Sequence, residues 1–286
     1  MSAKRNILIV IHPSRPDAAI FAEQIATELS AKDFNVFTNQ PSLLPVATPF
    51  SRGNAVELVV VLGGDGTILR AADLVKDEET PILGINLGNV GFMAQLHKPS
   101  LDQLVDAIVE GKFHTEPRLT ITFAIERDGK VIEEGWGLNE VTVERGSNQM
   151  VELFVQIDDR PLSRWGCDGV ICATPTGSTA YAFSAGGPVV WPEVNALVLL
   201  PLAAHALFSR PMVISPESRI VIDIESQSAE ISADGMRKVE LLQGDRISLT
   251  RSSKKIHLAY IEAGVFTDRL VAKFQLPVEG WRGGKE

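Results

Sequence analysis

The feature of this chain that most constrains its fold is a change in hydrophobic period near residue 118. Before it, continuous apolar runs such as "ELVVVL" (57–62) alternate with helical patterns such as "DAAIFAEQIATELSA" (17–31). This order is typical of a parallel sheet covered by helices on both faces. After it, "LTITFAIERDGKVIEEGWGLNEVTVERG" (119–146) alternates apolar and polar residues around a turn signal at Asp128-Gly129. That alternation predicts antiparallel hairpins and therefore a second, mostly β domain.

The same patterns set the expected domain boundaries. We predict an α/β domain over 1–117, a β-rich domain over 118–265 and a C-terminal segment over 266–286. Within the last segment, "TDRLVAKFQLP" (267–277) returns to helical spacing. Whether it packs back on the first domain stays open. The residues between Gln40 and Asn54 hold three prolines and are interpreted as a loop.

Charge and hydrophobicity exclude several classes of partner. The net charge of −9 disfavours general binding to nucleic acid or to an anionic membrane. An anionic ligand therefore needs local cations, backbone amides or a metal ion, which fits a nucleotide bound with magnesium. The apolar run at Ile7–Ile11 is too short for the core of a signal peptide, and the run over 196–208 is shorter than the roughly 18 residues of a membrane span. We interpret the second run as buried core, and the protein as cytoplasmic.

Cysteine and histidine usage gives no sign of a metal site. The two cysteines, Cys167 and Cys172, have no second pair to complete a zinc site and are expected to be reduced thiols. The histidines are scattered, which makes a histidine metal site improbable. They are His12, His97, His114, His205 and His257.

The first candidate site is "GGDGT", which joins the apolar run 57–62 to a helical pattern. A strand, a glycine turn and a helix start form an anion site, because backbone N–H groups converge there and the helix dipole favours negative charge. Gly63, Gly64 and Gly66 give backbone freedom and let phosphate oxygens approach, and Thr67 is a candidate helix cap. The alternative is a tight turn with an acidic cap. The five-residue match in this context favours phosphate binding.

Asp65 places a carboxylate in the middle of this anion site. The loop also lacks the lysine of a Walker loop, which would offset the repulsion. An acid has two useful roles there: it can hold a divalent metal that bridges phosphates, or it can accept the proton of an attacking hydroxyl. Arg70 lies within reach of a phosphate or is a solvated helix arginine; the sequence leaves both readings open.

The second candidate site is the Asn139-Glu140 pair in "GLNEVTVERG". Adjacent residues of a strand point to opposite faces of the sheet. From periodicity alone, we therefore expect one buried polar residue and one solvated residue rather than a binding pair.

The third candidate site is "CDGVICATPTGSTAYAFSAGGPVV" (167–190), in which a strand-like run leads into a segment of small hydroxyl residues. Hydroxyls and free amides at this density suit a ligand with many oxygens, such as ribose and pyrophosphate. A capped turn explains the pattern equally well, because Ser178 and Thr179 are ordinary caps. A serine nucleophile is excluded, since the segment is not a G-x-S-x-G elbow and no histidine is placed to serve it.

With these stretches in place, the chain resembles the NAD kinase family, the ATP- or polyphosphate-dependent enzymes that make NADP. The resemblance covers most of the chain and is weakest in the first 50 residues and at the C-terminus. The GGDGT loop is shared with lipid kinases, whereas "TPTGSTAY" together with the Asn-Glu pair is specific to NAD kinases. The matching segments are "GGDGTILRAA", "GINLGNVGFM", "LNEV", "DGVICATPTGSTAYAFSAGGP" and "PLAAHALFSRPMV".

The resemblance implies a fold and a set of site residues. It implies a Rossmann-like α/β N-terminal domain, an all-β, β-sandwich-like C-terminal domain, an active site between them and a homodimer or homotetramer. It makes Asp65 the base that acts on the 2′-hydroxyl of the adenosine ribose of NAD. The expected nucleotide-binding residues are Gly63, Gly64, Asp65, Gly66, Thr67, Arg70, Asn139, Glu140, Asp168, Thr176, Gly177, Ser178, Thr179, Ala180, Tyr181 and Ser184.

One departure from the family pattern concerns the acid Asp168. Many relatives place a basic residue just before this acid, whereas here the sequence reads "RWGCDG", with Arg164 further back. A cationic phosphate contact is therefore not transferred to this region.

The sequence thus predicts a kinase that transfers the terminal phosphoryl group of ATP, or of polyphosphate, to NAD. Magnesium or another divalent cation is expected, held mainly by the ATP phosphates. One alternative is a lipid kinase of the diacylglycerol kinase type, although the polar "TPTGSTAY" segment argues against an acyl groove. The other alternative is a non-catalytic NADP sensor, and the presence of Asp65 argues against it.

Overall fold

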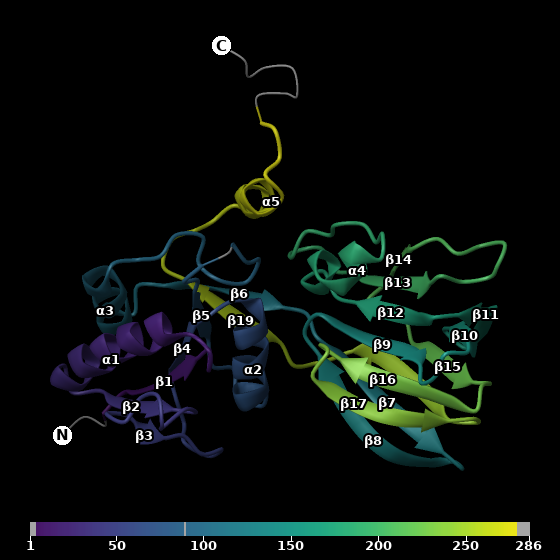
Figure 1. The fold of residues 1–286 in the computed structure, drawn as a ribbon, viewed down its shortest axis with the longest axis horizontal. Coiled ribbons are helices and arrows are strands. Elements are labelled where there is room, and N and C mark those ends of the chain that lie inside the picture. The colour runs from purple at the N-terminus through teal and green to yellow at the C-terminus, as the bar shows by residue number, and fades with distance from the viewer. Residues whose placement is uncertain (1–3, 89, 279–286) are drawn as a thin grey trace. The chain divides into compact units, whose positions relative to one another are not determined.

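A computed structural model describes residues 4–88 and 90–278 of the chain. Residue 89 of the "GINLGNVGFM" motif and residues 279–286 of the C-terminal segment lie outside this description. The chain divides into two compact units, one formed by 1–117 together with 256–286 and the other by 118–255. Figure 1 labels most of their helices and strands.

The first unit is built on a seven-stranded sheet in the order β3-β2-β1-β4-β5-β19-β6. The pairs β1–β2, β1–β4, β2–β3, β4–β5 and β5–β19 are parallel. The strands are β1 (Asn6–Ile11), β2 (Asn35–Thr38), β3 (Thr48–Pro49), β4 (Leu58–Leu62), β5 (Ile82–Ile85), β6 (His114–Arg118) and β19 (Ile256–Tyr260). The helices are α1 (Pro16–Ala31), α2 (Asp65–Val75), α3 (Leu101–Glu110) and α5 (Phe266–Phe274).

The continuous apolar runs of the first unit are its buried strands. All five residues of β4 and all four of β5 are buried, as expected for strands covered on both faces. Helix α3 starts at a capping box formed by Ser100 and Gln103 and ends at Gly111, whose φ of 66° is left-handed. The expected loop between Gln40 and Asn54 contains one short strand, β3, which pairs with the end of β2.

The second unit holds two six-stranded antiparallel sheets. Their orders are β11-β10-β15-β18-β7-β8 and β14-β13-β12-β9-β16-β17. The strands are β7 (Ile121–Arg127), β8 (Lys130–Gly137), β9 (Glu140–Arg145), β10 (Val151–Ile157), β11 (Arg160–Cys167), β12 (Gly169–Ala173), β13 (Leu197–Leu202), β14 (Met212–Ile214), β15 (Ile220–Ile224), β16 (Ser228–Ala233), β17 (Arg237–Leu242) and β18 (Arg246–Arg251). A 3-10 turn, η1 (Gly177–Thr179), and a short helix, α4 (Tyr181–Ser184), follow β12.

The inward-facing residues of both sheets make one core in the second unit, around the buried Trp165. The turn signal at Asp128-Gly129 is confirmed, because both residues have positive φ, 51° and 73°, as a two-residue hairpin turn requires. Cys167 and Cys172 are buried and unpaired with each other.

Two expectations about the chain differ from the structure. The run over 196–208 is buried only through β13; Leu207 and Phe208 are exposed, because the strand ends at Leu202 and a loop follows. Strand β19 pairs in parallel with β5 of the first unit, so that the second unit ends at Lys255 rather than at 265. The hydrophobic pattern could not assign β19 to the first unit, since this strand is as short and apolar as its neighbours in the β-rich unit. Among the described residues, no helix has the length and apolar character needed to span a membrane.

Candidate active site

The GGDGT loop lies where β4 ends and α2 begins. Gly64 is the N-cap of α2, with φ −92° and ψ −171°, and Asp65 is the first helical residue. A Cβ at Gly64 or Gly66 would meet no atom within 4 Å, so there is open space beside both glycines. None of the three loop glycines has a left-handed φ, so backbone freedom does not account for them. The geometry is that of an anion site at a helix N-terminus.

Thr67 does not cap α2, contrary to expectation. The N-cap residue is Gly64, and no side chain caps the helix. The Thr67 hydroxyl is buried, and a Cβ at Gly63 would lie 2.4 Å from it. Gly63 is therefore required for packing against Thr67. Arg70, one turn further along α2, is exposed.

Asp65 is held by a loop that the sequence did not connect with it. The N–H groups of Phe92 and Met93 donate to its carboxylate at 2.9 Å and 3.1 Å, one to each oxygen. A Cβ at Gly91 would lie 2.4 Å from Asp65 Oδ1, so only glycine fits there without displacing the carboxylate. The carboxylate is half-buried and keeps further lone pairs for a ligand hydroxyl.

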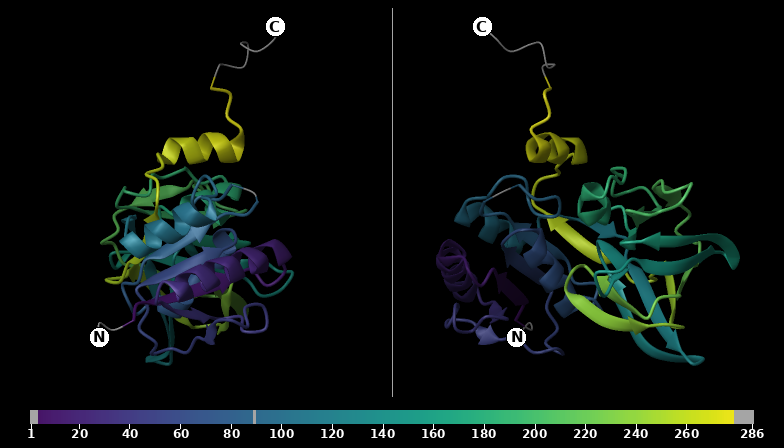
Figure 2. Two further views of the ribbon diagram at one scale, coloured as in Figure 1. Left: turned by 90° about the vertical axis from the view of Figure 1, so that its left-hand side faces the viewer. Right: turned by 45° about the vertical axis from the view of Figure 1, so that its right-hand side comes forward.

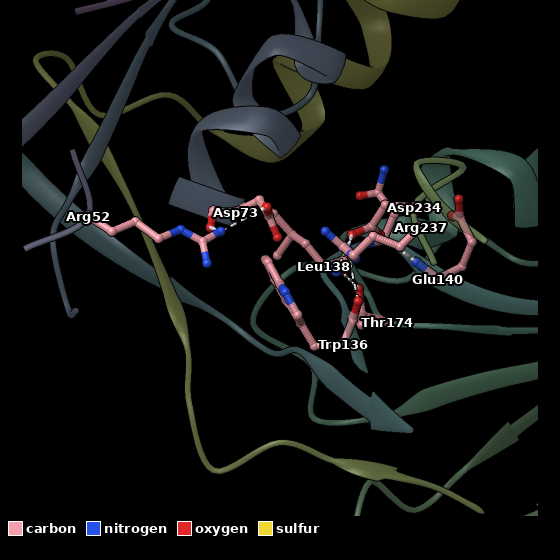
Figure 3. Close-up of polar contacts among 9 residues, drawn as sticks. Arg52, Asp73, Trp136, Leu138, Glu140, Thr174, Asp234 and Arg237 are labelled. Atoms are coloured by element: carbon pink, nitrogen blue, oxygen red, sulfur yellow. Dashed lines mark hydrogen bonds and ion pairs between the residues drawn. The ribbon is translucent and has the colours of Figure 1, made fainter. Parts of the chain in front are cut away.

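In the second unit, Asn139 and Glu140 are both buried, each 7% exposed, contrary to the alternation argument. Alternation does not apply to the pair, because β9 begins at Glu140 and Asn139 lies before the strand. The segment is held by Asp234, at the turn between β16 and β17 (Figure 3). Its carboxylate accepts the N–H groups of Leu138, Asn139 and Glu140 at 3.0, 2.7 and 3.3 Å. It also pairs with Arg237 at 2.7 Å. This contact holds the start of β9 and the Asn-Glu pair in place.

The electrostatics of this cluster centre on Glu140. Burial, reinforced by the nearby Asp234 carboxylate, raises the pKa of Glu140 to about 8, although a backbone hydrogen bond from Tyr181 acts in the opposite direction. One of its carboxyl oxygens, Oε2, is buried without a hydrogen-bond partner. Burial also raises the pKa of Asp234, against the opposing effect of its N–H donors and Arg237. At neutral pH, Glu140 is therefore mainly a neutral acid.

The "TPTGSTAY" segment is attached to the Asn-Glu pair through its backbone. Thr174 N donates to Asn139 O at 2.8 Å, and the buried Thr174 hydroxyl donates to Leu138 O at 2.6 Å. A Cβ at Gly177 would lie 1.9 Å from Asn139 O, which explains the glycine. The structure thus brings the second and third candidate sites together in one cluster.

Only part of the segment is open to a ligand. Thr176, Gly177 and Ser178 are buried, and the Ser178 hydroxyl bonds to the backbone of Pro175 and Val190 rather than capping a helix. Its accessible residues are Thr179, Ala180 and Tyr181, and Ser184, three residues after the segment, is also accessible.

Asp168 is half-exposed and forms an ion pair with Arg145, with Nε 3.3 Å from Oδ1. The cation beside this acid thus comes from the end of β9 and not from the residues before Asp168. Sequence reasoning missed Arg145 because β9 and β12 pair only in the folded sheet, where Arg145 N donates to Asp168 O. It missed Asp234 because "ISADGMRKV" was interpreted only as strand; the Asp-Gly pair, a hairpin signal, could have marked the turn.

Comparison with known proteins gives concordant results. The model of the ATP-NAD kinase N-terminal domain matches residues 7–113, and that of the ATP-NAD kinase C-terminal domain matches residues 138–261. NAD kinase 2 of Streptomyces avermitilis is 42% identical over 98% of this chain and 97% of its own length.

Two solved structures share the fold. Yeast NADH kinase complexed with NADH has a TM-score of 0.88 at 24% identity, covering all of this chain and 91% of that chain. The NAD kinase from Archaeoglobus fulgidus in complex with ATP has a TM-score of 0.71 at 26% identity, covering 94% of this chain and 98% of that chain.

Proposed function

The chain belongs to the NAD kinase family and is a phosphotransferase that makes NADP from NAD, and we propose that Asp65 is the base that receives the proton of the ribose 2′-hydroxyl. The observation that carries this assignment is the position of Asp65. It is the first residue of α2, next to two open glycines, and two backbone N–H groups fix its carboxylate. A ribose hydroxyl that is hydrogen-bonded to Asp65 would face phosphate oxygens bound at the same helix N-terminus.

This arrangement suits phosphoryl transfer. The transition state of the reaction is loose, so most of the rate comes from positioning and charge neutralisation rather than from a strong base. Asp65 orients the hydroxyl and takes its proton late in the reaction. The N–H groups at the start of α2 stabilise the phosphate charge.

The dinucleotide is proposed to bind in the second unit, at the cluster around Asn139 and Glu140. The supporting contacts are the Asp234 bonds to this segment and the backbone bond from Tyr181 to Glu140. Asp168 and the accessible residues of the "TPTGSTAY" segment complete the binding surface. The buried residues Thr176, Gly177 and Ser178 act by holding the segment in shape.

The metal ion is proposed to arrive with the nucleotide. No group of three or more His, Cys, Asp or Glu side chains within 4–88 and 90–278 could hold a metal ion. Magnesium would be bound mainly by phosphate oxygens, as is usual for this ion in kinases, and would neutralise their charge.

The proposal also covers the donor, the location and the assembly. It names ATP as the donor, with polyphosphate as a second donor, a cytoplasmic location, and a homodimer or homotetramer. The relatives named above give no support to a diacylglycerol-type kinase.

The experiment is an NADP-forming assay of the wild type and of Asp65→Asn, with ATP and polyphosphate compared as donors. We expect kcat to fall by about 10²- to 10⁴-fold, the usual contribution of a general base, with little change in the KM for NAD. Asp73→Asn is the matched control, because Asp73 is a carboxylate on the same helix that pairs with Arg52. Turnover of Asp65→Asn near that of the wild type would show that the base assignment is wrong. A wild type that forms no NADP would favour the sensor alternative.

A further inference from the structure

The C-terminal helix α5 contacts the loop that holds Asp65. Two of this loop's N–H groups, those of Phe92 and Met93, are the donors to the Asp65 carboxylate. The ring of Phe92 packs against two rings of α5, Phe266 at 5.9 Å and Phe274 at 5.8 Å between centroids. Figure 2 shows α5 as the last helix of the chain, in yellow. Its aromatic residues thus reach the residue that donates to the proposed base.

A buried arginine strengthens this contact. Arg269 of α5 is 3% exposed, and its Nη1 donates to the carbonyl oxygen of Ala94, two residues after Phe92. Its guanidinium also lies over the ring of Tyr260, 4.6 Å from the centroid. Because Tyr260 is the last residue of β19, Arg269 ties the loop both to α5 and to the sheet.

The loop is further fixed at Gln95. Its backbone N–H donates to Gly84 O of β5 at 2.7 Å. Its side chain accepts the N–H of Ile261 at 3.2 Å and donates to Glu262 O at 3.4 Å, and both of these residues precede α5. The segment from Phe92 to Gln95 is therefore held by β5 on one side and by the chain around α5 on the other.

We propose that α5 positions the Asp65 carboxylate through this loop, with Arg269 and Phe274 as positioning residues. The inference rests on the proposed role of Asp65. Loosening α5 frees Phe92 and Met93, and the carboxylate then loses the two donors that fix its direction. Misplacement of a reacting group by about 1 Å can cost about 10²-fold in rate, so a change in α5 lowers kcat without altering any residue that touches a substrate.

The first test compares Arg269→Met with Arg5→Met. Arg5 is the matched control because it also donates to backbone carbonyls, Val109 O and Ile108 O, and lies over an aromatic ring, that of Phe34, without contact to the Asp65 loop. We expect Arg269→Met to lower kcat by about tenfold with the KM for NAD within about twofold, and Arg269→Lys to recover part of the loss. We expect Arg5→Met to keep kcat within about twofold of wild type.

Hydrogen exchange gives a readout that does not depend on turnover. Amides of a peptide covering 92–95 should exchange faster in Arg269→Met than in the wild type or in Arg5→Met. Phe274→Ala removes a half-buried ring and provides a second variant in case Arg269→Met does not fold. If either folded variant shows faster exchange at 92–95 but wild-type kcat, the inference is overturned.

A double-mutant cycle separates this inference from the proposed function. Combined with Asp65→Asn, the Phe274→Ala or Arg269→Met change should lower kcat by less than about twofold more, because the group it positions is already gone. An equal fold-loss in both backgrounds would show that α5 acts elsewhere and would overturn the inference. Wild-type kcat in Asp65→Asn alone would instead overturn the assignment of the base.

Discussion

Three carboxylates of this chain differ in their surroundings, and their proposed roles follow from that difference. Asp65 is half-buried, with two N–H donors and room for a ligand. Asp234 is buried, with three N–H donors and an arginine. Glu140 is buried with one carboxyl oxygen unpartnered. The first is suited to work on a substrate, the second to hold a strand in place and the third to remain neutral.

The neutral state of Glu140 predicts a pH dependence of stability. Its pKa is about 8 in the folded chain and near 4.5 when unfolded, so between these values the folded state binds more protons. The stabilisation that comes from the raised pKa of Glu140 is therefore fully present below about pH 4.5 and is lost as pH rises towards 8. Across that range, the wild type should lose on the order of 4 kcal/mol relative to Glu140→Gln. Urea unfolding of both proteins at several pH values measures this difference, and a difference that stays constant with pH would contradict the prediction.

Gly91 gives a second prediction at the residue scale. In Gly91→Ala, the new Cβ would displace the Asp65 carboxylate, so we expect kcat to fall by about tenfold or more. Gly88→Ala in the same loop is the control, because its Cβ would meet the guanidinium end of Arg15 and not Asp65. Steady-state kinetics of both variants check this. Equal kcat values for the two would mean that the position of the carboxylate does not limit turnover.

Some of these residues were readable from the sequence and others were not. Asp65 could be predicted from the sequence, because its neighbours in the chain form the strand, turn and helix start around it. Asn139 and Glu140 came only from the resemblance to a family, and alternation alone gave the wrong burial for one of them. Asp234 lies 94 to 96 residues from the three N–H groups that donate to it, and Gly91 lies 26 residues after Asp65. Contacts of that range depend on strand pairing, which a local pattern does not specify.

At the scale of elements, the turn after β12 and the start of β9 behave as one piece. Thr174 joins them, because its N–H donates to Asn139 O and its hydroxyl donates to Leu138 O. Gly177 packs closely against Asn139 O and donates its N–H to the Thr174 hydroxyl. The sequence predicted each element, including the strand "GVICA" and the short helical turn after it. It did not predict that they meet, because β9 and β12 are brought together by antiparallel pairing.

Thr174→Val tests this connection. Valine keeps the shape of the fully buried side chain but loses the hydroxyl that bonds to Leu138 O and Gly177 N. We expect a loss of about 1–3 kcal/mol in unfolding free energy and a KM for NAD raised several-fold. Thr122→Val, where the hydroxyl contacts that of Thr250 between two strands, is the control for the substitution itself. An unchanged KM in a destabilised Thr174→Val would argue that the segment does not shape the NAD site.

At the scale of the whole molecule, the second unit is an insertion into the first. The chain leaves the first unit after Pro117 and returns to it at Ile256. The two crossing points are close within the second unit, since Ser252 N donates to Thr120 O at 2.8 Å and Thr120 Oγ1 to Lys254 O at 2.7 Å. The second unit also has a hydrophobic core made of its own residues.

We accordingly expect residues 118–255, expressed alone, to fold. The fragment should show β-type circular dichroism and a cooperative urea transition. Residues 1–117 alone should show no such transition, because their sheet lacks β19 between β5 and β6. A disordered 118–255 fragment would indicate that the second unit depends on the first.

The position of β19 also has a consequence for synthesis on the ribosome. The GGDGT segment emerges early, but the strand that completes its sheet emerges only after all of 118–255 has been made. At about 5–20 residues per second, this leaves the first unit incomplete for roughly 7–28 seconds. During that time, its apolar strands have neither their last parallel neighbour nor α5, so the nascent chain is more exposed to aggregation than the finished enzyme.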